Sequence, residues 1–324
     1  MPSPDASPEA AFGGVWNIVP TPFTPDGDLD VSSVRRLTDF VIGTGVDGMT
    51  ILGVMGEAPK LSDAERSAVI EATLATAGGR LPVCVGISHA ATDRAVAFGR
   101  EAAALGAHSV MLSPPQLAKP SDDAIRRHYL DVADAIDLPI VVQDYPPASG
   151  VQMSVALIAT LAGEAPTCRT LKLEDEPSPP KVYAVSRAEP RIAILGGLGA
   201  IMLYEELRAG AAGTMTGFGF PEVLIDIVDR FRAGDQEGAR DVFYRHLPLI
   251  RYENQPGINL PLRKHVYRRR GAMASECARF PVASLDPGTK HELDLILRHL
   301  GLADGLGPIE EGAAAKHANG GTKP

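Results

Sequence analysis

Short apolar runs alternate with longer segments of helical spacing through the first two thirds of the chain. The apolar runs are continuous, which is typical of parallel strands that are covered on both faces. A helical pattern follows each run, and Ser62 with Glu65 three residues later forms a capping box that predicts a helix to about Ala77. We predict strands at residues 14–20, 48–52, 82–87, 109–112, 139–143, 170–173, 192–195 and 213–216.

Eight strand–helix units in succession indicate an α/β fold, a (β/α)8 TIM barrel at residues 13–221. After Pro221 only helical patterns remain, so we predict a C-terminal α-helical region at residues 222–301 that packs on the barrel. Residues 1–12 and 302–324 are predicted to be disordered tails. An open doubly wound sheet is the alternative, disfavoured because no nucleotide-binding fingerprint follows the first strand.

Charge and cysteine usage narrow the class of partner. The formal net charge is −9, which argues against nucleic acid and anionic membrane as main partners but not against a small acidic substrate. The cysteines number three and lie far apart, so we expect a reducing compartment rather than a disulfide framework. No secretory signal is evident at the start, and no apolar run is long enough to span a bilayer. These features predict a cytoplasmic protein.

One lysine has an unusual context. Lys172 falls inside the apolar run of residues 170–173, whereas the other seven lysines fall in helix-like, loop-like or tail-like sequence where we expect solvated amines. Loss of water favours the neutral amine, which is a nucleophile for carbonyl carbon. Because side chains alternate along a strand, Lys172 and Glu174 should face the same way. The pair suits imine chemistry on a keto acid, although a Lys-x-Glu pair at a strand end can also simply reach solvent.

The loops after the strands supply the other candidate residues, because barrel enzymes place their chemistry there. The loop at residues 196–199 is rich in glycine but lacks the third glycine of a dinucleotide site, since position 202 is Met, and a phosphate site remains an alternative. No metal-ligand spacing is evident, and we expect no cofactor. The candidate substrate-binding residues are Val54, Met55, Glu57, Ser88, His89, Gln143, Asp144, Tyr145, Gly197 and Gly217.

Several motifs together resemble the dihydrodipicolinate synthase / N-acetylneuraminate lyase family of class I aldolase-type barrels. They are Gly53-x-x-Gly56-Glu57, a lysine on the sixth strand, the Pro-x-x-x-Gly150 end of the fifth loop and the helical C-terminus, and they cover about residues 14–300. The resemblance implies that Lys172 forms an imine with pyruvate or another 2-keto acid. It also implies that the amides around Val54 and Met55 hold the carboxylate, and that the protein is a homotetramer.

The chain departs from the synthases and the sialic acid lyase where their catalytic tyrosine stands. Counting back from Gly150, that position is Gln143, and Tyr145 falls two residues later. One branch, the 2-keto-3-deoxy-L-arabonate dehydratases, resembles this chain more closely, in Gln143-Asp144, in Lys172-x-Glu174 and in Ser88-His89. The strand 2 loop of this chain, Gly-Val-Met-Gly-Glu, matches that branch poorly and is nearer the general family form.

This resemblance favours a hydro-lyase that dehydrates a 2-keto-3-deoxy sugar acid, with Lys172 as nucleophile and Glu174 as base. Gln143 and Asp144 would orient the substrate or Glu174, and Ser88-His89 would assist the leaving hydroxyl. Two alternatives remain open. One is a pyruvate-dependent aldolase or condensing enzyme with Tyr145 in the place of the usual tyrosine, and the other is a non-catalytic sugar-acid-binding sensor barrel.

Overall fold

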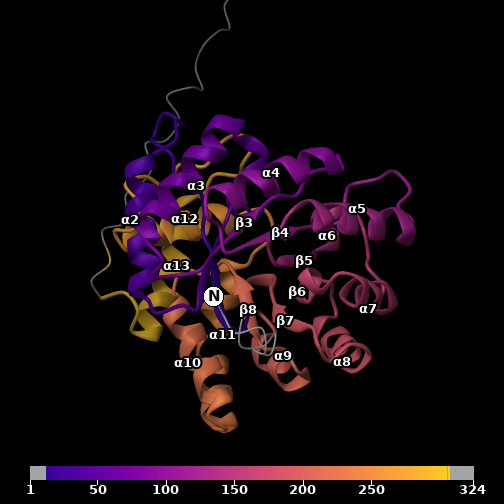
Figure 1. Ribbon diagram of the computed structural model, residues 1–324. Helices are drawn as coiled ribbons and strands as arrows, with labels where there is room; N and C mark the ends of the chain where they lie inside the picture. Colours follow the sequence, from indigo (N-terminus) through magenta and orange to yellow (C-terminus); the bar gives the residue numbers. More distant parts are fainter. Residues whose placement is uncertain (1–11, 305, 307–324) are drawn as a thin grey trace, which may run out of the picture.

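The protein is a closed barrel of eight parallel strands. The computed structural model describes residues 12–304 and 306, and within it each strand pairs with its sequence neighbours while β8 closes on β1 (Figure 1). The predicted TIM barrel is confirmed. The strands are β1 (Gly14–Ile18), β2 (Gly48–Ile51), β3 (Val83–Gly86), β4 (Ser109–Leu112), β5 (Ile140–Asp144), β6 (Thr170–Leu173), β7 (Ala193–Gly196) and β8 (Gly213–Thr216).

Helices cover the outside of the barrel between successive strands. Ser62 caps α3 as predicted, since its hydroxyl accepts from the Glu65 amide while the Glu65 carboxylate accepts from the Ser62 amide. Short helices also interrupt the loops after β2, β5 and β7 and the connection into β6, and the apolar pattern did not predict these. The main helices around the barrel are α2 (Val31–Gly43), α3 (Asp63–Ala77), α4 (Thr92–Ala104), α5 (Asp122–Ala135), α7 (Val155–Glu164), α8 (Ser178–Ala188) and α9 (Leu203–Ala209).

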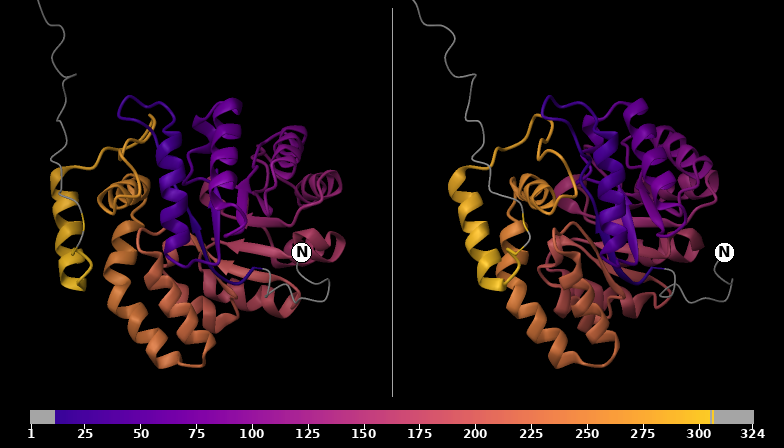
Figure 2. Two further views of the ribbon diagram at one scale, coloured as in Figure 1. Left: turned by 60° about the vertical axis from the view of Figure 1, so that its left-hand side comes forward. Right: turned by 90° about the vertical axis from the view of Figure 1, so that its left-hand side faces the viewer.

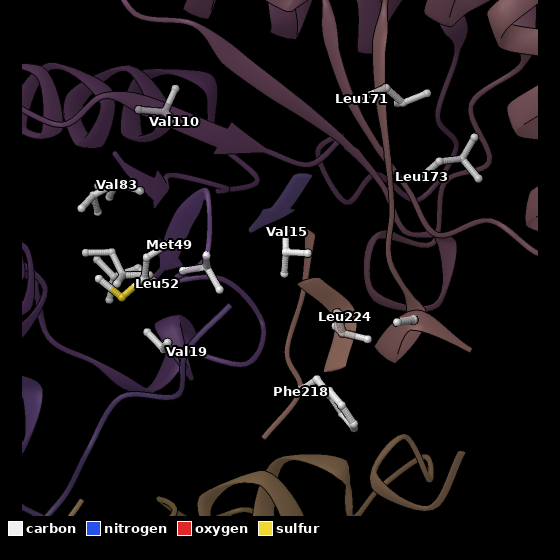
Figure 3. Packing of buried hydrophobic residues seen from close by; sticks show 14 of the residues in the cluster. Val15, Val19, Met49, Leu52, Val83, Val110, Leu171, Leu173, Phe218 and Leu224 are labelled. Carbon is white, nitrogen blue, oxygen red and sulfur yellow. The ribbon is translucent and has the colours of Figure 1, made fainter. Parts of the chain in front are cut away.

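Two separate apolar clusters follow from the alternation of side chains along each strand. Leu171 and Leu173 of β6 belong to the large outer cluster between strands and helices, together with Val15 and Val110 (Figure 3). The smaller cluster fills the barrel interior, so the barrel is a packed core rather than a pore. Its members are Phe12, Trp16, Ile18, Met55, Cys84, Met111, Val141, Ala193, Leu195 and Met215.

The C-terminal helices gather on one side of the barrel, next to α2 (Figure 2). They are α10 (Pro221–Arg232), α11 (Gln236–Glu253), α12 (Asn259–Arg269) and α13 (Pro287–Leu300). α10 contacts β1 and α11, and α11 contacts α9, α12 and α13. No helix in the described part of the chain is long and apolar enough to cross a membrane.

The predicted tails, residues 1–12 and 302–324, lie mostly outside the described residues. Phe12 is described, and its assignment to a tail was wrong. Phe12 is 3% exposed, belongs to the interior cluster, and stacks its ring on Trp16 with 5.0 Å between centroids. Leu302, the first residue of the predicted C-terminal tail, is hydrogen-bonded to the end of α13, because its amide donates to the Leu297 carbonyl.

His128 is a buried imidazole between α4 and α5. Its Nδ1 lies 2.9 Å from the Thr92 hydroxyl, its ring packs edge-on against Tyr129, and its Nε2 has no hydrogen-bond partner among the described residues. Burial lowers the pKa of His128 to about 4, and the charge of Asp131 acts in the opposite direction. Acidification below the ordinary imidazole pKa therefore protonates the unfolded chain before it protonates the folded one.

We expect His128 to make the free energy of unfolding depend on pH in a defined window. The folded-state pKa is depressed, so stability falls as the pH drops from about 6.5 toward 4 and changes little more from this group below that. Between pH 7 and pH 5 the wild type should lose about 2 kcal/mol more than His128→Asn, measured by urea denaturation. His291→Asn, in an exposed position on α13, should keep the wild-type pH dependence, and parallel curves for all three proteins would contradict the assignment.

Candidate active site

A lysine, a carboxylate and a carboxamide meet at the C-terminal end of the barrel. Lys172 projects inward from β6, on the side opposite to Leu171 and Leu173, and its amine contacts a carboxylate oxygen of Glu174 directly. Gln143 is paired with Lys172 in the register of β5 and β6, and its Nε2 donates to the same Glu174 oxygen at 2.9 Å. All three side chains are buried. As predicted, the structure places the side chains of Lys172 and Glu174 on the same side of the chain.

The β7 loop holds the other oxygen of Glu174. The Leu198 amide donates to Glu174 Oε1 at 3.4 Å, and the Gly199 amide donates to the Thr216 hydroxyl at 2.9 Å. Leu198 and Ala200 both have positive φ, at 49° and 67°, which non-glycine residues adopt at a cost of order 1–3 kcal/mol each. A third residue with positive φ, Leu52 at 57°, directly follows β2 across the barrel. Such strain is typical of loops shaped around a site.

The absence of a side chain at Gly197 leaves the space that the Glu174 side chain occupies. A Cβ built at Gly197 would lie 2.3 Å from Glu174 Cγ and 2.7 Å from its Cδ. The carboxylate therefore packs against the bare backbone at the end of β7. This gives Gly197, which was predicted as a substrate contact, a role in seating Glu174.

A cavity of about 750 Å³ opens over the ends of β2 to β5. Gln143 lies both in the wall of the cavity and in the Lys172 cluster, so it connects the two. Lys172 and Glu174 themselves are buried and are not among the residues that line the cavity. The predicted residues that line the cavity are Val54, Glu57, Ser88, His89, Gln143 and Tyr145.

The polar side chains in the wall differ in how freely they can meet a ligand. Ser88 accepts the Ser113 amide at 2.9 Å, and His89 Nδ1 accepts the Ala91 amide at 3.0 Å, while both residues stay exposed. Tyr145 is half-buried, and burial raises the pKa of its phenol, with the charge of Glu174 adding to the effect. Tyr145 therefore offers a protonated hydroxyl near the cluster at neutral pH.

Asp144 does not join the site. It follows Gln143 on β5, so alternation turns it to the outer face, where its Oδ2 lies 2.6 Å from Lys181 Nζ of α8. Burial is the main cause of the raised pKa of this carboxyl, and Lys181 opposes the shift. The expectation that Asp144 contacts the substrate is not supported, and the residue instead fastens β5 to α8.

Glu57 reaches the cavity wall, but its carboxylate is bound elsewhere. Lys264 Nζ lies 2.6 Å from one oxygen, and Lys60 Nζ and the Arg279 amide lie 2.9 and 3.0 Å from the other. Its backbone adopts positive φ, at 53°, at the turn into a short 3-10 helix. Glu57 thus ties the β2 loop to the C-terminal region, and the structure gives its carboxylate no free oxygen for substrate.

Lys172 is not the only buried lysine, contrary to our expectation. Lys264 is fully buried, donates to the carbonyls of Thr21 and Cys277, and has its pKa lowered to about 8 by burial. Lys290 is 4% exposed and pairs with Glu276 at 2.6 Å. Both lie on helices whose pattern suggested solvated amines. Lys172 remains distinct because it projects into the barrel end beside the cavity.

Sequence reasoning missed Arg263 of α12. Its guanidinium is buried over the β2 loop and the end of β8, where it donates to Met55 Sδ at 3.0 Å and to Asn254 Oδ1 at 3.0 Å. Gly217, predicted as a substrate contact, lies beneath it, since a Cβ there would be 3.4 Å from Arg263 Nη1. The linear sequence carried no signal for this placement, because Arg263 stands in a helix far from every strand end.

No cluster of three or more His, Cys, Asp or Glu side chains in the described chain has the arrangement of a metal site. The cavity wall contains the Gln143 carboxamide, the Tyr145 phenol and the His89 imidazole, and Gln143 also contacts the buried Glu174 carboxylate that pairs with the Lys172 amine. An amine in contact with a carboxylate, both shielded from bulk water, can form and protonate a carbinolamine.

Comparisons with known proteins agree with this arrangement. Residues 11–300 match the Dihydrodipicolinate synthetase family. The L-2-keto-3-deoxyarabonate dehydratase of Azospirillum brasilense is 37% identical over 294 residues, covering 89% of this chain and 94% of that protein. A 4-hydroxy-tetrahydrodipicolinate synthase of Sorangium cellulosum is 34% identical over 242 residues, covering 74% and 79%.

Solved structures show the same fold. The dihydrodipicolinate synthase of Rhodopseudomonas palustris superposes with a TM-score of 0.85 at 37% identity, covering 92% of this chain and 100% of that one. YagE of Escherichia coli K12, solved in complex with pyruvate, superposes with a TM-score of 0.84 at 26% identity, covering 90% and 99%. The family resemblance that the motifs indicated is confirmed, and the chain belongs to the dihydrodipicolinate synthetase family of lyases.

Proposed function

We propose that this protein is a hydro-lyase that dehydrates a 2-keto-3-deoxy sugar acid, such as 2-keto-3-deoxy-L-arabonate, through an imine on Lys172. The observation that carries the proposal is the buried Lys172–Glu174–Gln143 cluster, in which a carboxamide occupies the β5 position next to the lysine. The relative from Azospirillum brasilense, named as a dehydratase of this substrate class, supports the same choice.

Glu174 can serve each proton transfer of imine formation. It takes a proton from the Lys172 ammonium, and the neutral amine then forms a bond to the C2 carbonyl carbon. Glu174 returns this proton to the C2 oxygen and then carries a second proton from the nitrogen to the resulting hydroxyl, which leaves as water and generates the iminium. The amide of Leu198 and the carboxamide of Gln143 keep the carboxylate oriented while its charge changes.

The elimination uses the same carboxylate. The iminium withdraws electrons and acidifies the C3 proton, which Glu174 removes to form the enamine. The C4–O bond then breaks, and the hydroxyl takes up the proton and leaves as water. Tautomerisation and hydrolysis free Lys172 and release a keto acid lighter by one water. Ser88 and His89 lie in the cavity wall, where they can contact the sugar hydroxyls.

A second candidate has its own support. Several relatives are named 4-hydroxy-tetrahydrodipicolinate synthase, and Tyr145 places a phenol in the cavity wall, within reach of the charge of Glu174. These features suit a pyruvate-dependent condensation or aldol cleavage. The dehydratase is preferred because Gln143, rather than a tyrosine, stands beside Lys172.

Lys172→Met should abolish turnover while the barrel remains folded. Borohydride added with a 2-keto acid should reduce the imine and leave a stable mass adduct, and peptide mapping should place it at residue 172. Lys264 is the necessary comparison, because it is also buried with a lowered pKa but projects away from the barrel interior toward Glu57. An adduct at Lys264, or none at all, would refute the mechanism, and Lys119→Met at an exposed position should behave as wild type.

Product masses should decide between the two candidates. We expect a panel of 2-keto-3-deoxy pentonates and hexonates to yield a product that keeps the whole carbon chain and has lost one water. Aldol cleavage would instead release pyruvate together with an aldehyde. Pyruvate as the main product, or condensation of added pyruvate with an aldehyde at a higher rate, would favour the second candidate.

Gly197→Ala should lower kcat roughly 100- to 10,000-fold, as a lost acid–base group does, because the new methyl group displaces Glu174. Glu174→Gln should cause a loss of the same order and should also slow formation of the Lys172 adduct, because Glu174 serves the proton transfers of imine formation. Gly163→Ala is the matched control, since a Cβ there meets nothing within 4 Å and the position is an exposed one in α7. Full activity in Gly197→Ala would show that the position of Glu174 does not depend on its packing against Gly197.

A further inference from the structure

Lys181 of α8 lies on the outer side of the barrel wall, behind the Lys172 cluster. Its amine bonds two carboxylates at once, Asp144 Oδ2 at 2.6 Å and Asp175 Oδ2 at 2.8 Å. Asp144 is the last residue of β5, and Asp175 comes two residues after β6 ends. Lys181 therefore joins the C-terminal ends of two neighbouring strands from one point on a helix.

Glu174 lies between the two residues that this amine holds. It follows the last residue of β6, its amide donates to the Asp144 carbonyl at 2.8 Å, and Asp175 is the next residue in the chain. Its carboxylate is held on the inner side by Gln143 and Leu198. The backbone of the base is thus fixed from outside the barrel and its side chain from inside.

The helix that carries Lys181 is fixed by other neighbours. Ser178, in the first turn of α8, donates to Glu206 of α9 at 2.6 Å, and both residues are buried. Glu206 packs against the bare backbone of Gly196 at the end of β7. α8 also contacts α7, α9 and β7 (Figure 1). The amine is therefore presented to β5 and β6 by an element whose position other parts of the barrel set.

Stability alone does not account for this ion pair. Asp144 is fully buried, and the same amine serves both it and Asp175. Replacing a buried ion pair by apolar side chains of similar volume is often neutral or stabilising for a fold. Leu171 and Leu173 show that the outer face of β6 is otherwise packed in that way. Charge-assisted hydrogen bonds differ from apolar packing in that they fix the direction of the groups they join.

We propose that Lys181 is a positioning residue that clamps the ends of β5 and β6 together and so holds Glu174 in place for its proton transfers. The inference rests on the proposed function. Lys181 does not line the cavity, so it acts through the backbone of Asp144, Glu174 and Asp175 and not on the substrate.

Steady-state kinetics with 2-keto-3-deoxy-L-arabonate test this role. Lys181→Met should lower kcat about 10- to 100-fold and leave KM near the wild-type value, because a shift of about 1 Å in a catalytic group can cost roughly 100-fold. Lys181→Arg keeps a cation for both carboxylates and should lose less. Arg187→Met is the matched control, since it removes an exposed cation near the other end of α8 and should leave both constants unchanged.

A double variant separates positioning from stability. Lys181→Met alone leaves the Asp144 carboxylate buried without its cation, which destabilises the fold. Adding Asp144→Asn removes that charge, so Tm should recover toward the wild-type value. In the double variant kcat should stay as low as in Lys181→Met, because the clamp is still absent. The rate of borohydride trapping with pyruvate at Lys172 should follow the same order, since Glu174 also serves imine formation.

An unchanged kcat in Lys181→Met, or recovery of kcat together with Tm in the double variant, would overturn the positioning role. A rise in KM at constant kcat would overturn it as well. A wild type that neither turns over the sugar acid nor forms the Lys172 adduct with pyruvate is a different result. It would overturn the proposed function itself, and with it this inference.

Discussion

The contact between Lys172 and Glu174 is the constraint on which the site depends. Two opposite charges held out of water are costly, and removing either partner from such a pair typically costs about 3–5 kcal/mol. The structure offsets the cost by directing further donors, the Gln143 carboxamide and the Leu198 amide, at the same carboxylate. Each donor comes from a neighbouring strand or its loop, so the arrangement requires β5, β6 and β7 in one register. A closed barrel supplies this register without a free edge.

The packing of the barrel interior explains why the pair lies where it does. Trp16, Met111, Val141, Leu195 and Met215 fill the lower part of the barrel with apolar side chains and leave no room for a charged group. Leu195 is the register partner of Lys172 on β7, so the apolar core reaches the level of the lysine backbone. The amine extends toward the open end, where it contacts Glu174, and the Glu174 side chain in turn packs against Gly197. Strained backbone at Leu52, Leu198 and Ala200 lies in the loops around this end, where it shapes polar groups around the pair.

The sequence predicted the parts of the site that local rules govern and missed those that depend on packing. Strand period placed Lys172 and Glu174 on one face, and the boundaries of β4, β6 and β8 agree with the apolar runs. The same period, applied to Gln143 and Asp144, would have sent Asp144 outward to Lys181, but both were placed in the site because the motif contains both. Lys264 was assigned to solvent because α12 reads as polar, yet α12 is enclosed by the β2 loop and by residues 276–279. No linear pattern carries that information.

The C-terminal helices also hold the loops of the site in place, so the strand ends alone do not define the site. Lys264 secures the β2 loop through Glu57, Asn254 donates to the Leu198 carbonyl of the β7 loop at 2.7 Å, and Glu253 accepts the Gly219 amide after β8. The boundary at residue 221 is therefore a division of the sequence and not of the site. From Arg263 a hydrogen-bonded path runs through Asn254 and Leu198 to Glu174. Through this path the helical region that contacts the β2 and β8 loops also helps to orient the Glu174 carboxylate.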